Sequence, residues 1–149
     1  MELGYLPHVI TTSMESEASD VGKWLAEFED RRWERPFAVV AGGETIVKVK
    51  GKGKGGRNQE MALSAALVLQ GKKDVVFFSF GSDGTDGPTD AAGGIVNGMT
   101  IQKIRDKGLD ASELLADNDS YRALKAADGL IITGPTGTNV NDVSVLLCR

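Results

Sequence analysis

The sequence predicts an α/β protein of three layers, α/β/α, built on a mixed, largely parallel sheet. Three apolar runs lack the alternation of a half-exposed strand, as is typical of strands buried on both faces: residues 37–41, 75–80 and 130–133. A helical pattern at 57–69 is apolar around nearly its whole circumference, so we expect that helix to lie between layers. Glycine-rich polar loops follow the strands, where ligands of open α/β sheets bind.

The size and composition are those of one ordinary globular domain. The chain has 149 residues, 41% of them hydrophobic and 26% charged, with a net charge of −4. No basic face exists outside one loop, which argues against nucleic-acid binding. Cys148 is the single cysteine, so a disulfide within the chain and a cysteine metal site are excluded, and a cytoplasmic location fits. No long apolar run predicts a membrane span.

The first third of the chain predicts three strands and one helix. Leu6–Thr11 is a short strand, and an amphipathic helix then extends to about Trp33, with Thr12 and Glu15 as a capping box. The expected later strands of this part are 37–41 and 45–50, paired antiparallel across Gly42-Gly43-Glu44. Structural roles are expected for three aromatic side chains: His8, Trp24 and Trp33.

The remainder alternates helices and strands. The expected helices are 57–70, 100–107, 111–116 and 120–127, and the expected strands are 74–80, 130–133 and 143–147. Gly108 ends the second of these helices, and Asp90 is expected to cap another. The Asp117-Asn118-Asp119 segment is assigned to capping and turns.

A glycine-rich loop at residues 51–56 carries the main chemical signal. It lies between the strand-like run 45–50 and the helix that begins at Arg57, and it holds positive charges with no acid among them: Lys48, Lys50, Lys52, Lys54 and Arg57. Glycine lets backbone N–H groups approach an anion, and a helix N-terminus adds unpaired donors and a positive dipole end. We therefore interpret this loop as a phosphate cradle. The alternative is a solvated hairpin tip.

Two nucleotide motifs fail at this loop. Gly51, Gly53 and Gly56 match G-x-G-x-x-G, but the acid expected about twenty residues later falls near Asp74, at the start of a strand rather than its end. Gly56 is followed by Arg57-Asn58 rather than by Lys and Ser or Thr, so the P-loop pattern is not met.

An acidic loop at 81–94 is the second chemical centre. Asp83, Asp86 and Asp90 stand at spacings of three and four after a buried strand, among glycines and hydroxyls. Magnesium takes one or two protein carboxylates and keeps several waters, so Asp83 and Asp86 are candidate Mg²⁺ ligands. Asx turns are the alternative for both residues. Glu44 is either a turn residue or an acid that faces the cradle.

Five motifs, in this order, resemble the MOFRL domain. That domain forms the C-terminal part of class II glycerate kinases, the glycerate 2-kinase family, some members of which carry a hydroxypyruvate reductase label. The motifs are GGET (42–45), GKGKGGRNQE (51–60), GSDGTDGPTDAAG (81–93), ADNDSY (116–121) and TGPTGTNVND (133–142). The likeness runs from about residue 2 to residue 147.

The resemblance implies the C-terminal part of a two-domain kinase with its active site in the cleft between domains. ATP and Mg²⁺ would be cosubstrates, D-glycerate the acceptor and 2-phosphoglycerate the product. Residues 1–33 would join a missing N-terminal domain to a MOFRL-like domain at 34–149. Because that domain would supply a partner lysine, we expect this chain alone to be inactive. The sequence leaves a homodimer open.

The roles that follow are expectations. Catalysis is assigned to Arg57, Asp83 and Asp86, with Asp83 and Asp86 also holding the metal. The residues assigned to phosphate or substrate binding are Gly53, Gly55, Gly56, Asn58, Glu60, Asn139 and Asp142. Two other functions compete with kinase activity: an NAD(P)H-dependent hydroxypyruvate reductase, and an anion-binding module without catalysis.

Overall fold

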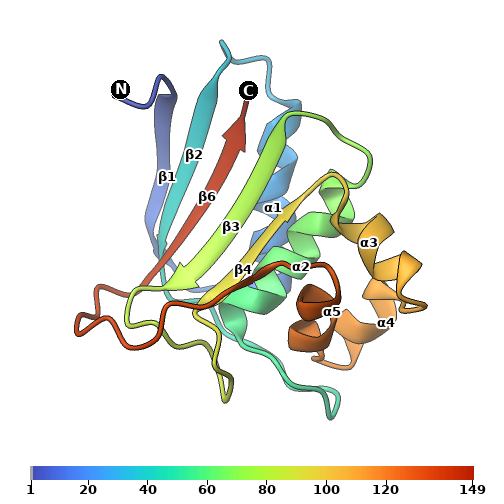
Figure 1. Ribbon diagram of the computed structural model, residues 1–149. Helices are drawn as coiled ribbons and strands as arrows, with labels where there is room; N and C mark the ends of the chain where they lie inside the picture. Colours follow the sequence, from blue (N-terminus) through green and yellow to red (C-terminus); the bar gives the residue numbers. More distant parts are fainter. Residues whose placement is uncertain (1) are drawn as a thin grey trace.

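The computed structural model describes residues 2–149 and forms one six-stranded sheet with helices packed against it (Figure 1). The strands are β1 (Leu6–Met14), β2 (Phe37–Gly43), β3 (Val75–Gly81), β4 (Gly93–Asn97), β5 (Leu130–Ile131) and β6 (Asp142–Cys148). The helices are α1 (Ala18–Ala26), α2 (Arg57–Leu69), α3 (Thr100–Asp106), α4 (Ala111–Ala116) and α5 (Ser120–Ala126), with a 3₁₀ turn η1 (Glu27–Asp30) after α1.

The sheet is mixed, but the prediction that it is largely parallel is wrong. The strand order is β1-β2-β6-β3-β4-β5, and only β1 and β2 pair in parallel among the described strands. The other four pairs are antiparallel. The reason lies in the last strand, β6, which inserts between β2 and β3 and runs against both. A parallel pair needs a long crossover, which α1 provides between β1 and β2. The connection from β4 to β5 also carries helices, α3 to α5, but it returns the chain antiparallel.

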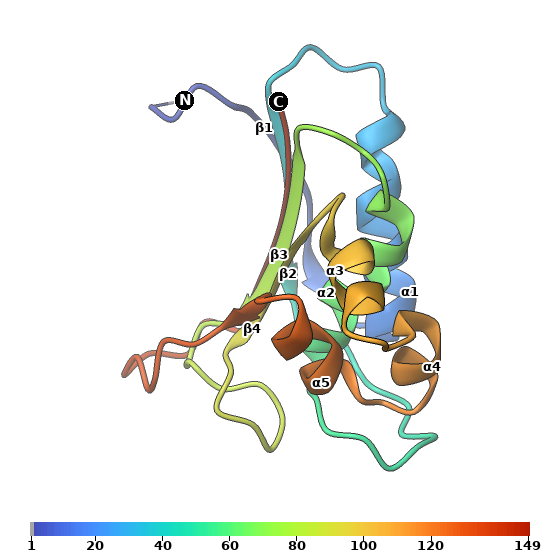
Figure 2. The same ribbon diagram turned by 45° about the vertical axis from the view of Figure 1, so that its right-hand side comes forward.

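The described helices pack on one face of the sheet, so the chain forms two layers rather than the predicted three (Figure 2). The core lies between them, with Phe37, Phe77 and Leu146 from the sheet fully buried against Met61 and Leu63 of α2. Helix α2 is buried around most of its surface, as its sequence predicts, because α1 and α5 flank it within the same layer. Residues before 34 share this core through α1, for example Leu25.

The contact between α1 and α2 depends on Gly22. A Cβ atom at that position would lie 2.2 Å from the carbonyl oxygen of Met61, so the two backbones are in direct contact. Only glycine permits this approach.

Several local predictions are wrong. The expected strand 45–50 is irregular chain with a single bridge, between Ile46 and Glu17. The expected capping box fails because Thr12 lies within β1, and Glu17 precedes α1. Asp90 caps no helix, since strand β4, which the sequence analysis missed, follows it.

The predicted structural roles of the aromatic residues are supported. The rings of His8 and Trp33 stack with their centroids 4.0 Å apart. Trp24 is 43% exposed and packs edge-to-face on Phe28, so it covers the core rather than filling it. No helix in residues 2–149 is both long and apolar enough to cross a membrane.

Candidate functional site

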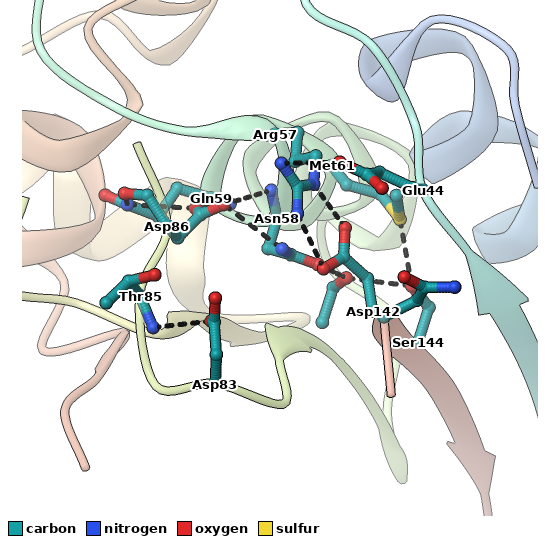
Figure 3. Close-up of polar contacts among 12 residues, drawn as sticks. Glu44, Arg57, Asn58, Gln59, Met61, Asp83, Thr85, Asp86, Asp142 and Ser144 are labelled. Atoms are coloured by element: carbon teal, nitrogen blue, oxygen red, sulfur yellow. Dashed lines mark hydrogen bonds and ion pairs between the residues drawn. The ribbon is translucent and has the colours of Figure 1, made fainter. Parts of the chain in front are cut away.

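Three chain segments from distant parts of the sequence meet at one end of the sheet. Gly43 ends β2, Gly81 ends β3, and Asp142 begins β6 between them, paired with both. Helix α2 begins at Arg57 beside this end (Figure 3). We call Gly43, Gly81, Asp142 and Arg57 the site rim. Insertion of β6 places a carboxylate directly beneath the first residue of α2.

The guanidinium of Arg57 is held by two carboxylates (Figure 3). Its Nε donates to Asp142 Oδ2 at 2.5 Å and its Nη2 donates to Asp142 Oδ1 at 3.1 Å, which is the two-pronged geometry of a strong arginine–carboxylate pair. Its Nη1 lies 3.4 Å from Glu44 Oε1. The hydrogen bonds that Arg57 donates to Asp142 raise the pKa of Arg57 further, so the side chain stays charged.

The two carboxylates differ in burial. The side chain of Asp142 is 2% exposed and that of Glu44 is 58% exposed, while Arg57 is 32% exposed. Asp142 therefore fixes the position of the guanidinium. Glu44 makes a longer, solvent-screened pair that an anionic ligand could replace at little cost. Of the two alternatives for Glu44, the structure supports the acid that faces the site.

Asp86 is committed to the first turn of α2. Its Oδ1 accepts from the backbone N–H and side-chain Nδ2 of Asn58, and its Oδ2 accepts from the backbone N–H and Nε2 of Gln59, at 2.9–3.1 Å. The residue is 2% exposed, and this burial raises the pKa of its carboxyl group. Asp86 thus does from a distant loop what a helix-capping residue does locally.

A chain of buried polar groups continues from Asp86 into the sheet. Asn58 Oδ1 accepts from Ser79 Oγ at 2.6 Å, and Ser79 Oγ lies 2.8 Å from Ser144 Oγ. Ser79 and Ser144 are paired residues on neighbouring strands and are almost fully buried. Such a network fixes one rotamer of Asn58 and hence the orientation of the first turn of α2. Asn58, assigned to substrate binding, therefore has a structural role here.

The glycine-rich loop is not an open phosphate cradle along its whole length. The N–H groups of Lys50 and Gly51 donate to Asn118 Oδ1, those of Lys52 and Lys54 to the carboxylates of Asp117 and Asp119, and that of Gly53 to a carbonyl. We call residues 117–119 the acidic turn. The acidic turn accepts hydrogen bonds from the backbone N–H groups in the first half of the loop. These include the N–H of Gly53, a residue that was assigned to phosphate binding.

The amides nearest Arg57 remain available. Within residues 2–149, no hydrogen bond to another protein group engages the N–H of Gly55, Gly56 or Arg57. These three donors lie at the N-terminus of α2, where the helix dipole favours an anion. The anion site expected from the sequence is therefore confined to residues 55–57.

The glycines of the loop are required by protein contacts. A Cβ on Gly51 or Gly53 would lie 2.3 Å from atoms of Asp117 or Asp119, and a Cβ on Gly56 would lie 2.4 Å from Cγ of Asp86. The loop is clamped between the acidic turn and the Asp86 loop, with no space for side chains. This close packing also holds the available amides in place.

Asp83 and Asp86 do not form a metal site together. All of the hydrogen bonds to the Asp86 carboxylate come from α2, leaving its buried oxygens no room for a cation, and no group of three potential acidic, histidine or cysteine ligands occurs among the described residues. Asp83 is different, because it is partly exposed to solvent and accepts one bond from the N–H of Thr85, which lowers its pKa. The donor set does not fit Mg²⁺ held by both residues.

Asp83 nevertheless faces the site rim. A Cβ on Gly81 would lie 3.1 Å from Oδ1 of Asp83 and 3.5 Å from Oδ1 of Asp142, so both carboxylates converge above this glycine (Figure 3). Asn139 lies in the exposed loop before β6 and accepts from the N–H of Asn141. The structure places Asn139 on the same side of the molecule, without a contact to Arg57.

A cavity of about 520 Å³ lies between the glycine-rich loop and residues 45–49. It is lined by Thr45, Ile46, Val47, Val49, Gly53, Gly55, Gly56, Arg57, Glu60, Gly87, Pro88, Asn118 and Ser120. Glu60 is 6% exposed, and its desolvation raises the pKa to about 6 although Asn118 donates to Oε1 at 3.0 Å. Glu60 therefore lines the cavity, and its assignment to substrate binding stays a prediction.

Glu60→Gln should stabilise the protein at pH 7.5 by about 1–2 kcal/mol. Glutamine keeps the acceptor for Asn118 and carries no charge to bury. Because the folded-state pKa of Glu60 is raised from 4.5 to about 6, the wild type should lose stability relative to the variant as pH rises through this interval, and the two should converge below it. Urea unfolding from pH 4 to pH 8 measures this difference. Glu34→Gln, at an exposed position, is the control, and a difference that does not change with pH would contradict the prediction.

The sequence analysis missed the acidic turn and the buried serines. Asn118 contacts the loop from about 67 positions away, and it adopts a positive φ of 56° that aims its side chain at the loop. A polar residue within an apolar strand, such as Ser79, was the available signal for the buried network.

The chain belongs to the MOFRL family, whose model matches residues 37–142. The resemblance stated from the motifs is thereby confirmed, and the match includes Glu44, Arg57, Asp83 and Asp142 of the site.

The chain is similar to proteins named as glycerate kinases. A D-glycerate 2-kinase of Thermotoga maritima is 52% identical over 97% of this chain and 36% of its own length, and a glycerate 2-kinase of Pyrococcus horikoshii is 46% identical over 97% and 34%. The crystal structure of glycerate kinase from Thermotoga maritima superposes with a TM-score of 0.96 at 51% identity, covering 99% of this chain and 37% of that one. The chain thus spans about a third of the length of these relatives. A protein named as a hydroxypyruvate reductase in Agrobacterium vitis is less similar, at 39% identity.

Proposed function

We propose that this chain forms the arginine-bearing part of a glycerate kinase, which transfers phosphate from ATP to D-glycerate and releases 2-phosphoglycerate. One observation carries the proposal: Arg57 presents a guanidinium fixed by buried Asp142, next to three N–H groups available at the start of α2. Fixed positive groups that offset developing negative charge are what phosphoryl transfer requires of a protein.

The positive groups have separate roles. The N–H groups of Gly55, Gly56 and Arg57 bind the carboxylate of glycerate or a phosphate of the donor. The guanidinium, released from exposed Glu44, contacts the oxygens of the transferred phosphoryl group. Asp142 holds Arg57 in position during substrate binding and during phosphoryl transfer. It can do so because its side chain is buried, so water does not compete for its bonds to the guanidinium.

Asp83 is the second catalytic candidate. It is the partly exposed carboxylate beside the rim, and its lowered pKa keeps it ionised, so it is suited to accept a hydrogen bond from the acceptor hydroxyl and orient it. ATP and magnesium remain predictions of this function. As a ligand of Mg²⁺, Asp83 offers an accessible carboxylate. The carboxylate of Asp86 cannot serve as a ligand, because its oxygens accept hydrogen bonds from α2.

The rest of the enzyme completes the site. The chain matches about a third of its relatives' length, which supports a further domain across the rim, as proposed from the sequence. Residues 1–33 would lead from that domain into β1 and α1 of this one. The location in the cytoplasm and the absence of nucleic-acid partners stay predictions.

The isolated chain should show no turnover that depends on both ATP and D-glycerate. A chimera in which it replaces the matched third of the Thermotoga maritima enzyme should form 2-phosphoglycerate. Phosphorus NMR of the product distinguishes 2- from 3-phosphoglycerate. Normal turnover by the isolated chain would contradict the proposed division of the site, and an inactive but folded chimera would contradict the function.

The two competing functions predict different outcomes. Reductase activity would appear as NADH oxidation with hydroxypyruvate and without ATP. The occupied amides at residues 50–54 disfavour it, because a dinucleotide cradle needs them for the pyrophosphate. An anion-binding module would bind phosphate or glycerate in the chimera and turn over neither pair of substrates.

A further inference from the structure

The sheet face opposite the helices is apolar and has no covering layer in this chain (Figure 2). Register places its side chains in rows across neighbouring strands, the central row being Val9, Val40, Val145, Phe78 and Ile95. The flanking rows contribute Ala38, Leu147 and Val76 on one side and Val143 and Phe80 on the other. We call these residues the open face.

The composition of the open face differs from that of a solvated sheet. Strands β2 and β3 contain no charged residue, and the one in β6 is Asp142, which points to the helix side. Antiparallel sheets with one wet face normally alternate apolar and polar residues, and here both alternate sets are apolar. Val9 is 66% exposed and Ile95 41% exposed. A contiguous apolar surface of this kind marks an interface.

One loop of the candidate site projects on the same side as the open face. Residues 132–141 extend past the sheet away from the helices (Figure 2), whereas Asp86 and Asp90 of the 82–92 loop bond to α2 and α5. A domain that covers the open face therefore also lies against the 132–141 loop, which contains Asn139. The proposed function requires one further domain at the site rim. The relatives carry about two thirds of their length outside the matched region, which is enough for such a domain.

We propose that the open face is the docking surface for the remaining domain of the full-length polypeptide, which supplies apolar helix faces as the third layer of the sheet. This inference rests on the proposed function for the identity of the partner. One rigid contact then covers the sheet and fixes the distance between Arg57 and the residues across the cleft.

Cysteine labelling tests the docking surface directly. Val145→Cys and Ile95→Cys place thiols on the open face, and Lys103→Cys places one on exposed α3 as a control. Native Cys148 is buried, with a pKa raised to about 11, so it reacts slowly. Each variant is labelled with a maleimide in the isolated chain and in the full-length chimera with the Thermotoga maritima enzyme, and mass spectrometry identifies the modified site.

The chimera should protect Val145→Cys and Ile95→Cys by about tenfold or more relative to the isolated chain, while Lys103→Cys reacts equally in both. If each of the three variants is labelled at the same rate in the chimera as in the isolated chain, the proposal is overturned. A second copy of this chain is the competing occupant. Protection of Val145→Cys in the isolated chain that rises with protein concentration, together with a dimer in sedimentation, would assign the face to self-association and also overturn it.

This experiment is independent of activity. Labelling needs neither ATP nor glycerate, so a chimera with a protected face and no kinase turnover would refute the proposed function and leave the docking surface intact. Conversely, an active chimera with an unprotected face would refute the docking surface alone.

Discussion

Replacing Arg57 with alanine should reduce the turnover number of the full-length chimera by roughly 10³-fold or more, the range measured for arginines that stabilise phosphoryl transfer. The guanidinium is the fixed positive group at the rim, and alanine leaves nothing to offset the charge of the transferred phosphoryl group. An assay that couples ADP release to NADH oxidation measures kcat. Arg122→Ala, at an exposed position of α5, is the matched control.

Stability must be separated from catalysis in this experiment. Asp142 is 2% exposed, so loss of Arg57 leaves a buried carboxylate without its partner and should also lower the free energy of unfolding. Arg57→Lys keeps a positive charge near Asp142 but cannot make the two-pronged contact. It should unfold at nearly the wild-type temperature and still lose most of its turnover. Near-normal kcat in either variant would remove Arg57 from the mechanism.

Asp86→Ala should lower the free energy of unfolding by about 3 kcal/mol or more, because several buried donors lose their acceptor at once. The backbone N–H groups of Asn58 and Gln59 and both of their side-chain amides donate to this one carboxylate. Urea denaturation of the isolated chain, followed by circular dichroism, measures the change.

Asp83→Ala is the matched control, since Asp83 is partly exposed and lies three positions away. It should leave stability within about 0.5 kcal/mol and reduce turnover in the chimera, which is the opposite pattern. A stability change below about 1 kcal/mol in Asp86→Ala would contradict the capping role. It would also return Asp86 to the candidate metal ligands.

Arg57 illustrates how far local sequence leads toward the site. The glycine-rich stretch before a helical pattern was sufficient to predict an anion site, and in the structure the last three N–H groups of that stretch have no protein acceptor. The partners of the loop could not be inferred in the same way. Asp117, Asn118 and Asp119 have the composition of an ordinary turn, and their contact with the loop spans more than 60 positions.

By itself, the sequence determined the elements whose signals are local: the 57–69 helix by its apolar pattern, strands at 37–41, 74–80 and 143–147 by their apolar runs, and the family by its motifs. The structure moves the ends of these strands by one or two residues. Tertiary structure alone decided where β6 inserts, which face of the sheet the helices cover, and that Asp86 caps α2 while Asp142 holds Arg57. Periodicity encodes which residues avoid water over a few turns or a few residues of strand. Strand order and pairs between distant side chains depend on the free energy of the whole packed chain, so no local pattern specifies them.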